Sequence, residues 1–391
     1  MNRVYTSLRG IHIFAINMGK KVRVKFHGKE KSRFQAVLRE RVNAHFLTQQ
    51  ISQHANFAMV LKSAILLCAY IVPFILILAW APSLSVSLLL WTLMGIGVAG
   101  IGMSVMHDAN HGAYSKYPAV NFIMGHTLNI IGGSVLNWKL QHNILHHTYT
   151  NIAFLDDDIE DRLVLRFSPH SRLKKFHAYQ WLYATVFYGF LTFYWALFKD
   201  FVQYFSFIKT GVNAFSPKEN RINLFKIIGI KIVYFTYIFV IPVFVLGFSF
   251  LPLVLGFLLM HFVAGMILTI VFQLAHTVEG TSHPLPDENG VIENDWAIHQ
   301  MNTTMNFAMH NKLITWYVGG LNYQVEHHLF PGICHVHYPA IAPIVEQTAK
   351  EFDIPYLVNP TLGDALSAHY RVMYRYGREE SPTSLALKAT A

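Results

Sequence analysis

The chain has 391 residues, of which 53% are hydrophobic and only 14% are charged, whereas soluble domains carry about 25% charged residues. This balance predicts membrane spans instead of a large soluble core. The only two cysteines, Cys68 and Cys334, are too few for a disulfide framework or a cysteine-based metal site. The formal charge of +9 equals the excess of residues 1–56, which hold eleven Lys and Arg against two acids.

The basic N-terminal segment precedes the first apolar run, a position that usually marks the cytoplasmic side of a membrane. Anionic headgroups explain such a run without a folded basic module, so we expect membrane lipid and no nucleic acid as its partner. Residues 32–46 place apolar side chains at three- and four-residue spacing, which predicts a helix. This helix either packs on the surface of the domain or lies in the membrane interface.

Four apolar runs are long enough to cross a hydrocarbon core about 30 Å thick. They cover residues 59–80, 86–106, 227–248 and 253–275. The turns at 81–85 and 248–252 carry no charge, whereas the segments rich in Lys and Arg flank the opposite ends. The positive-inside rule therefore predicts two helical hairpins with both termini in the cytoplasm. We expect a membrane domain over residues 57–376, preceded by a basic cytoplasmic segment with an interfacial helix (1–56) and followed by a flexible tail (377–391).

Two further apolar stretches, residues 120–138 and 181–198, lie between the two hairpins. The first is interrupted by His126, Asn129, two glycines and Asn137, which suits an interfacial or re-entrant piece. The second is rich in Tyr and Trp, which favour the boundary between water and lipid. If only one of them crossed, the histidine clusters would lie on opposite sides. We therefore predict that neither stretch crosses the membrane.

Histidines gather in three short clusters, each with the spacing of one helical face. The clusters are His107-Asp108-Ala109-Asn110-His111, His142-Asn143-Ile144-Leu145-His146-His147 and Gln324-Val325-Glu326-His327-His328. His276 ends the fourth span at the depth where His107 ends the second. These eight imidazoles exceed the four ligands of one zinc and fit two metals with open positions for oxygen. Gln324 offers an amide oxygen as a weaker ligand, directly or through water.

Polar residues around the clusters carry further expectations. Asp108 and Glu326 could accept the second imidazole N–H and fix its tautomer, or could form ordinary salt bridges. The run Asp156-Asp157-Asp158-Ile159-Glu160-Asp161 is typical of a solvated loop, or of a docking surface for an electron donor or a substrate headgroup. Among the remaining histidines we expect structural hydrogen bonds for His261, no ligand role for His335 and His337, and solvent exposure for His170 and His177.

The three clusters resemble the histidine boxes of the membrane fatty acid desaturases: His-x(3–4)-His, His-x(2–3)-His-His and (His/Gln)-x-x-His-His. Box order and intervening spans agree over roughly residues 30–370. Gln324, within Gly-Gly-Leu-Asn-Tyr-Gln-Val-Glu-His-His-Leu-Phe-Pro, resembles the front-end subgroup. That subgroup inserts a double bond between an existing one and the carboxyl end, commonly at Δ6 or Δ5.

The resemblance implies an all-α integral membrane protein with four transmembrane helices in two hairpins and a cytoplasmic helical cap. It implies two irons, dioxygen as co-substrate, a long-chain fatty acyl substrate and two external electrons. The ligands would be His107, His111, His142, His146, His147, His276, His327 and His328, with Gln324 as a weak addition. Trp138 and the aromatic residues near Trp181 would be plausible walls of an acyl tunnel.

Many front-end members carry a fused cytochrome b5 domain, whose haem motif is His-Pro-Gly-Gly. This sequence has only His283-Pro284-Leu285, so we expect no haem in this chain and a separate donor, ferredoxin or cytochrome b5. A bacterial inner membrane is favoured over an endoplasmic reticulum. The acyl carrier remains open between coenzyme A, carrier protein and lipid.

Two other functions compete with desaturation. A hydroxylase or related oxygenase would use the same scaffold and add oxygen to the chain instead of removing hydrogens. A metal transporter would instead place ionisable or ligand residues midway through several spans, whereas the histidines near the spans of this sequence sit at span ends, with His261 the lone exception.

Overall fold

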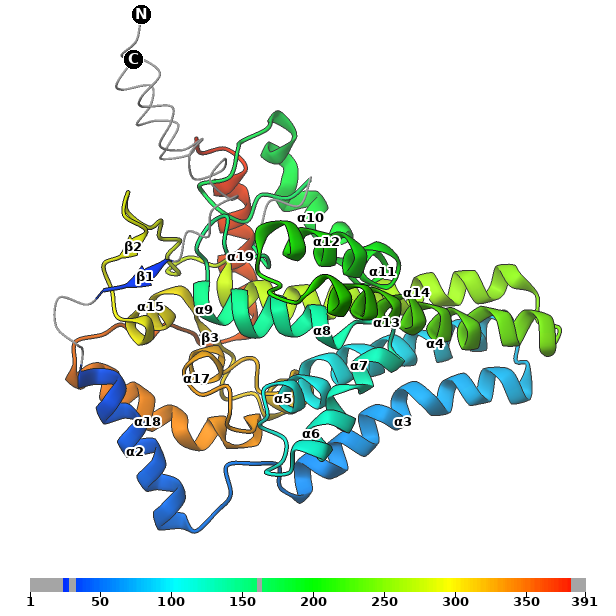
Figure 1. Ribbon diagram of the computed structural model, residues 1–391, viewed down its shortest axis with the longest axis horizontal. Helices are drawn as coiled ribbons and strands as arrows, with labels where there is room; N and C mark the ends of the chain where they lie inside the picture. Colours follow the sequence, from blue (N-terminus) through cyan, green and yellow to red (C-terminus); the bar gives the residue numbers. More distant parts are fainter. Residues whose placement is uncertain (1–23, 28–32, 160–163, 381–391) are drawn as a thin grey trace, which may run out of the picture.

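The computed structural model describes residues 24–27, 33–159 and 164–380, and the chain in these ranges is mainly helical (Figure 1). The strands within them are two residues long and pair in parallel. β1 (Lys25–Phe26) pairs with β2 (Val291–Ile292), and β3 (Asn306–Phe307) pairs with β4 (Val358–Asn359). Most of the basic segment and the end of the predicted tail, from residue 381, lie outside the described residues.

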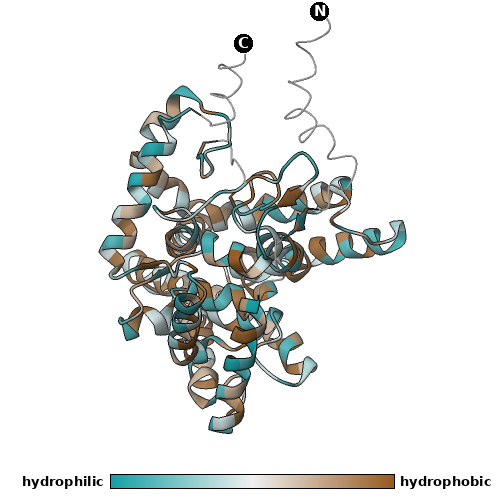
Figure 2. Ribbon diagram, turned by 90° about the vertical axis from the view of Figure 1, so that its left-hand side faces the viewer, coloured by the Kyte–Doolittle hydropathy of each residue, from teal (hydrophilic) through white to brown (hydrophobic). Residues whose placement is uncertain are grey.

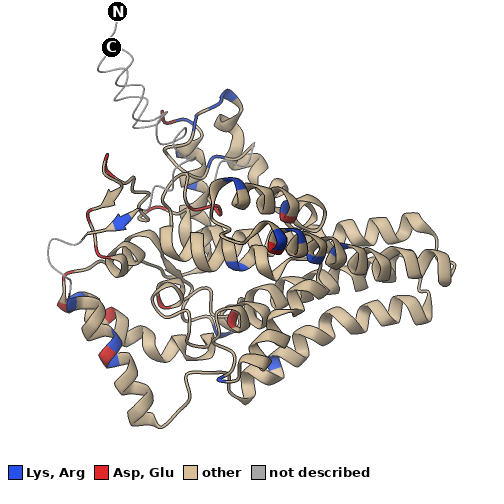
Figure 3. Ribbon diagram, in the orientation of Figure 1, with Lys and Arg blue, Asp and Glu red and all other residues tan. Residues whose placement is uncertain are grey.

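Four long apolar helices confirm the four predicted spans. They are α3 (Phe57–Trp80), the continuous helix of α4 (Leu84–Gly100), η2 (Ile101–Val105) and α5 (Met106–Asn110), the helix of α13 (Pro217–Phe235) and η6 (Thr236–Val245), and α14 (Phe250–His276). Each is long enough to cross a bilayer. They extend to the right in Figure 1, and their tips carry no Lys, Arg, Asp or Glu in Figure 3.

The third of these helices begins at Pro217, well before the predicted start at residue 227. Its first turns are polar, so hydropathy alone placed the boundary too late. The start is a capping box. The backbone N–H of Ser216 donates to Glu219 (2.8 Å), and the N–H of Glu219 donates to the Ser216 hydroxyl (3.3 Å). Pro217 occupies the first helical position, where its missing N–H costs nothing.

The spans pack around α4, which contacts both α3 and α14. Trp91 of α4 is fully buried against Gly256 of α14, where an added Cβ would lie 2.1 Å from the indole. The outward faces expose large apolar side chains, including Ile75, Phe225 and Val233. An apolar surface of this extent requires a lipid environment, so the protein is an integral membrane protein.

The two ambiguous apolar stretches are broken helices. One runs through α6 (Pro118–Gly125), α7 (Thr127–Ile130), α8 (Val135–Trp138), η3 (Lys139–His146) and α9 (His147–Tyr149), with a bend of 108°. The other runs through η4 (Lys175–Tyr179), α10 (Gln180–Gly189), α11 (Leu191–Tyr194), η5 (Trp195–Lys199) and α12 (Asp200–Thr210), with a bend of 52°. Each is therefore a broken span or a re-entrant segment.

The remaining helices gather at the end of the molecule away from the span tips. They are α2 (Arg33–Gln49), α15 (Trp296–Thr303), α16 (Lys312–Tyr317), α17 (Gln324–Leu329), η7 (His335–His337), α18 (Tyr338–Glu351) and α19 (Leu362–Tyr376). α2 confirms the helix predicted over 32–46. Its apolar stripe is buried against α18, as expected of a helix packed on the domain surface. Figure 2 looks onto this end, where hydrophilic and hydrophobic residues are interspersed.

Candidate metal centre

The first histidine cluster continues the second span without a break. A π-helical turn, η2, precedes α5, which carries His107, and His111 caps α5. The loop before the third cluster packs directly on this turn. Gly319 has φ +67°, and an added Cβ would lie 2.3 Å from the carbonyl oxygen of Met103. Only glycine allows so close an approach, and the approach brings α17 beside α5.

The eight predicted histidines come together in two adjoining groups. The first consists of His107, His111, His142 and His327, whose ring nitrogens lie within 4.8 Å of one another. The second consists of His146, His276 and His328, within the same limit. His147 stands between them, with its ring centroid 4.7 Å from that of His327 and 4.5 Å from that of His328. Residues from five separate helical segments thus form one cluster.

The spacing of the nitrogens fits metal coordination. Nε2 of His142 lies 3.3 Å from Nε2 of both His107 and His147. Imidazole binds first-row metals at about 2.0–2.1 Å, which puts two ligands of one tetrahedral ion roughly 3.3 Å apart. Nε2 of His111, His146 and His327 is buried with no hydrogen-bond partner among the described residues. Buried polar atoms without partners are costly, and a bound metal would satisfy them.

Burial also favours the protonation state that a metal requires. Burial lowers the pKa of His327 well below its usual range, and the neighbouring His107 and His147 lower it further. The pKa of His328 is lowered in the same way, first by burial and then by His147 and His146. Both imidazoles are therefore neutral at physiological pH, and neutral imidazole is the form that binds metal.

Gln324 lies against the second group. Its Nε2 is 2.9 Å from Nε2 of His276 and 3.2 Å from Nε2 of His328. A 180° rotation of the amide exchanges its oxygen and nitrogen, so the oxygen can instead face Nε2 of His276 and His328. The position of Gln324 is compatible with a weak ligand, which stays a prediction.

Three residues that the sequence analysis did not assign orient the histidines from outside. Asp156 is fully buried, and its carboxylate lies 3.0 and 3.1 Å from Nδ1 of His146. Gln300 Oε1 lies 2.8 Å from Nδ1 of His328, and the Tyr338 hydroxyl lies 3.2 Å from Nδ1 of His327. Partners of this kind fix the tautomer of a metal ligand and raise its basicity.

The described part of the acidic run, residues 156–159, does not form the solvated loop that we expected. Asp156 is inaccessible to solvent, and Asp158 lies 3.9 Å from Nδ1 of His142. Several acidic residues in a row usually indicate an exposed loop, because charged side chains are rarely buried. The expectation fails here because histidines provide buried partners for the carboxylates. The sequence feature that could have indicated this contact was the position of Asp156 shortly after the second cluster. Residues 160 and 161 lie outside the described residues.

Glu326 does not contact a histidine, contrary to expectation. Its carboxylate accepts hydrogen bonds from Asn306 Nδ2 (2.8 Å) and from the Tyr356 hydroxyl (2.7 Å). Burial raises the pKa of this carboxyl to about 7. The Asn306 side-chain oxygen also accepts from the backbone N–H of Val325 (2.9 Å). Glu326 therefore anchors α17 to β3, and a sequence cannot distinguish that role from a contact with its neighbour in the chain.

Asp108 contacts His107 only at 3.6 Å and lies closer to His335, with 2.8 Å between its Oδ2 and Nδ1. Nε2 of His335 in turn lies 2.9 Å from Nζ of Lys62, which is buried in α3. Lys62, His335 and Asp108 thus connect the first span to the first cluster. His335 thus links two charged side chains, and its expected lack of a ligand role stays a prediction.

The other histidines lie only partly where the sequence analysis placed them. His261 is buried and hydrogen-bonded, with 2.8 Å between its Nε2 and the Tyr234 hydroxyl. His337 Nε2 lies 3.0 Å from the His54 carbonyl oxygen. The expected solvent exposure of His170 was wrong, because this residue is half-buried and its Nε2 lies 2.7 Å from the His283 carbonyl oxygen. The expectation for His177 was wrong, because this residue is fully buried and accepts a hydrogen bond from the backbone N–H of Lys174.

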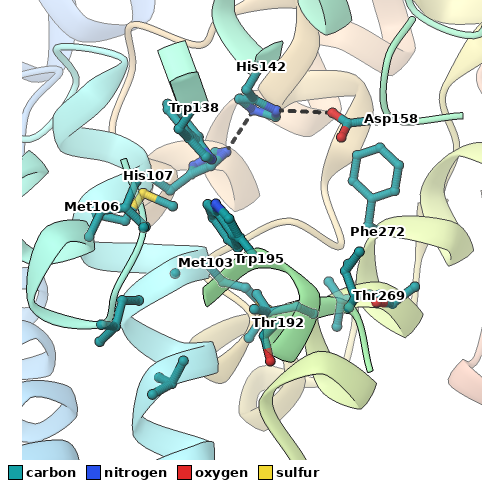
Figure 4. Close-up of a pocket in the computed structure, with 18 of the residues that line it drawn as sticks. Met103, Met106, His107, Trp138, His142, Asp158, Thr192, Trp195, Thr269 and Phe272 are labelled. Carbon is teal, nitrogen blue, oxygen red and sulfur yellow. Dashed lines mark hydrogen bonds and ion pairs between the residues drawn. The ribbon is translucent and has the colours of Figure 1, made fainter. Parts of the chain in front are cut away.

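An apolar cavity of about 190 Å³ adjoins the first histidine group. His107 and His142 lie at one end of the cavity and Thr192 at the other (Figure 4). Trp138 is part of the wall, as predicted, whereas Trp181 is 36% exposed and does not line the cavity. An apolar space beside a cluster of histidines suits a hydrocarbon chain held next to a metal centre.

The fold and the site together define an integral membrane protein with a histidine cluster, compatible with a metal site, beside an apolar pocket. Comparison with known proteins identifies the class more closely. The family described as fatty acid desaturase matches residues 84–360. The chain therefore belongs to the fatty acid desaturase family, and it is an oxidoreductase that desaturates fatty acyl chains.

Three relatives illustrate the similarity. The sn-1 linoleoyl-lipid 6-desaturase of Arthrospira platensis is 39% identical, over 86% of this chain and 90% of its own. The acyl-lipid (8-3)-desaturase of Physcomitrium patens is 37% identical, over 92% of this chain and 75% of its own. The sn-1 linoleoyl-lipid 6-desaturase of Synechocystis is 36% identical, over 91% of this chain and 98% of its own.

Proposed function

We propose that this protein is a front-end acyl-lipid desaturase that works at two irons held by the two histidine groups. The observation that carries the proposal is the position of these groups at one end of an apolar cavity. The proposed ligands are the eight clustered histidines, with Gln324 as a weak ninth beside His276 and His328. The names of the relatives support a lipid-linked substrate and a Δ6-type position of the new double bond.

The reaction removes one hydrogen from each of two adjacent methylenes of the acyl chain. Dioxygen leaves as two waters: the substrate supplies two electrons and two protons, an external donor supplies two electrons, and the solvent supplies two protons. When bound, the irons would supply the activation of dioxygen. Asp156, Gln300 and Tyr338 orient the imidazoles that they contact, burial keeps His327 and His328 neutral, and the apolar pocket walls exclude water from the hydrocarbon chain.

The convergence of the histidines supports the proposed topology. His276 ends the fourth span, and its ring centroid lies 4.7 Å from that of His146. If only one of the broken helix pairs crossed the membrane, histidines of the same group would lie on opposite sides. We therefore propose four crossings, with both pairs re-entrant. The distribution of Lys and Arg supports a cytoplasmic metal centre, and the cyanobacterial relatives support a bacterial membrane.

Fatty-acid profiling of a host that expresses the protein tests this proposal. Wild type should yield a new acyl species that lacks two hydrogens, and His146→Ala should not. His310→Ala, which alters an exposed histidine, is the matched control and should behave as wild type. A product that gains one oxygen would identify a hydroxylase, and equal profiles for wild type and His146→Ala would refute the metal centre.

The acyl carrier and the donor need a second experiment with purified, iron-loaded protein. We expect turnover of a lipid-linked linoleoyl chain and none of the same chain on coenzyme A. Reduced ferredoxin and reduced cytochrome b5, each added separately, identify the donor. Turnover of the coenzyme A ester alone would overturn the assignment to acyl-lipid substrates.

A further inference from the structure

Trp195 occupies the middle of the apolar cavity. Figure 4 shows its indole between His107 and Trp138 on one side and Thr192 on the other, so a chain that runs the length of the cavity must pass it. Space around the ring is limited. A Cβ added at Gly133 would lie 3.2 Å from Cζ2 of Trp195. The position of this indole therefore determines the free path through the cavity.

The indole is held in place by a buried ion pair. Trp195 Nε1–H donates to Asp200 Oδ1 (3.1 Å), and the Trp195 carbonyl accepts from Lys231 Nζ (3.1 Å). Asp200 Oδ2 and Lys231 Nζ are 2.6 Å apart, and the two side chains are 0% and 7% exposed. The residue that shapes the cavity is thus fixed through both its side chain and its backbone.

The same ion pair anchors the bend of the first re-entrant segment. Lys231 Nζ donates to the Gly132 carbonyl (2.6 Å), and Asp200 Oδ2 accepts from the backbone N–H of Ser134 (3.1 Å). The Gly132 carbonyl and the Ser134 N–H both lie at the break between α7 and α8. Ionisable groups in membrane segments are costly and are retained where they serve a function. Here the pair holds one wall of the cavity against the third span.

We infer that Trp195 is a specificity-determining residue, which sets how the acyl chain lies beside the histidines and so which carbon–carbon bond is oxidised. This inference rests on the proposed function. Asp200 and Lys231 act through Trp195 as positioning residues. The physical reason is that a misplacement of roughly 1 Å at the reacting centre changes the rate about a hundredfold. A change in the wall at Trp195 is therefore enough to exchange one methylene pair for the next.

The test uses the full-length, iron-loaded protein and a lipid-linked acyl chain of defined length. Trp195→Phe removes the N–H and part of the ring, and Trp195→Leu removes more of the volume. Asp200→Asn removes the charge that holds the indole. We expect each variant to keep its iron and to change the ratio of positional isomers about tenfold, as measured by mass spectrometry of derivatised products. Trp181→Phe, outside the cavity, is the matched control and should not change this ratio.

Two results would overturn the inference. One is a set of Trp195 variants that produce the wild-type isomer alone, at every chain length tested. The other is a Trp195→Phe protein that retains iron and yields no product, because the indole would then be needed for the chemistry and not for the choice of bond. Failure of the wild type to desaturate any chain would instead refute the proposed function. If Asp200→Asn loses its fold, the two Trp195 substitutions still decide the question.

Discussion

The carboxylate of Asp156 lies 3.0 Å from Nδ1 of His146, and both side chains are fully buried. The same carboxylate accepts the backbone N–H of Asn151 (2.9 Å), which fixes the loop that follows the second cluster. This relationship directs Nε2 of His146 toward His276 and His328. It is the shortest contact between a carboxylate and any of the proposed ligands in the described residues.

Asp156→Asn should weaken iron binding. The substitution keeps the shape of the side chain and removes the charge that makes the imidazole more basic, an effect typically of about 10- to 100-fold in metal affinity. Iron per purified protein, measured during titration with a competing chelator, gives the affinity. Asp353→Asn is a suitable control because Asp353 is exposed with φ 53°, a conformation that Asn tolerates. Equal affinity in both variants would contradict the role of Asp156.

Gln324→Ala should retain more iron than His328→Ala. An amide oxygen is a weaker ligand than imidazole for such metals, and the Gln324 amide lies beside two histidines that remain in place. Iron content and the optical spectrum of the ferric protein are the measurements. Gln324→His supplies an imidazole at the same position and should retain iron fully. Equal iron loss in the Gln324→Ala and His328→Ala proteins would show that the amide is as important as a histidine.

Lys62→Met should destabilise the protein strongly. Lys62 is 2% exposed and is connected to Asp108 through His335, so its removal leaves a buried carboxylate with less compensation. Loss of one partner of a buried ionic network typically costs about 3–5 kcal/mol. Thermal unfolding in detergent measures the effect. Lys116→Met, at an exposed position, should unfold at the wild-type temperature, and a stable Lys62→Met protein would show that the network is not needed.

Stability should decrease in mild acid, and part of this decrease should come from His369. Burial lowers the pKa of His369 to about 4. Its Nε2 lies 2.8 Å from the Tyr188 hydroxyl, and its Nδ1 lies 2.7 Å from the Thr277 carbonyl oxygen. The folded-state pKa is below the usual value of about 6.5. The contribution of His369 to stability is therefore complete above about pH 6.5. It is lost as the pH falls from about 6.5 towards 4.

The matching experiment compares melting temperatures of wild type and His369→Gln between pH 7.5 and 5. The variant loses the hydrogen bonds of the imidazole, so it should be less stable at pH 7.5. It also lacks the titrating group, so its melting temperature should decline less steeply on acidification. Parallel curves for the two proteins would exclude His369 as a source of the pH dependence.

Removal of the metal should lower the melting temperature, and ferrous iron should restore it. A ligand that binds only the folded state stabilises it in proportion to the logarithm of its free concentration over Kd. Without metal, buried nitrogens such as Nε2 of His146 and His327 have no hydrogen-bond partner among the described residues. Differential scanning fluorimetry of chelator-treated and reloaded protein provides the measurement. Magnesium is the control, since it prefers oxygen ligands and should not stabilise the protein.

The sequence by itself determined the four spans and the set of clustered histidines. Long apolar runs have few alternatives to a membrane helix, and the spacing of His142, His146 and His147 is a local property of one segment. Sequence reasoning also located the helix over 32–46, because amphipathic periodicity is local as well. The capping box at Ser216 was readable too, although hydropathy obscured it.

Only the tertiary structure decided which polar residues serve the histidines. Asp156 and Glu326 are both acidic neighbours of a cluster, yet Asp156 contacts His146 whereas Glu326 binds Asn306 and Tyr356. The partners of Trp195 could not be predicted either, since Asp200 and Lys231 meet only where the two broken helices pack against the third span. Contacts between distant segments depend on how helices pack. Composition and periodicity report the environment that a residue needs, but they do not identify the neighbour that provides it.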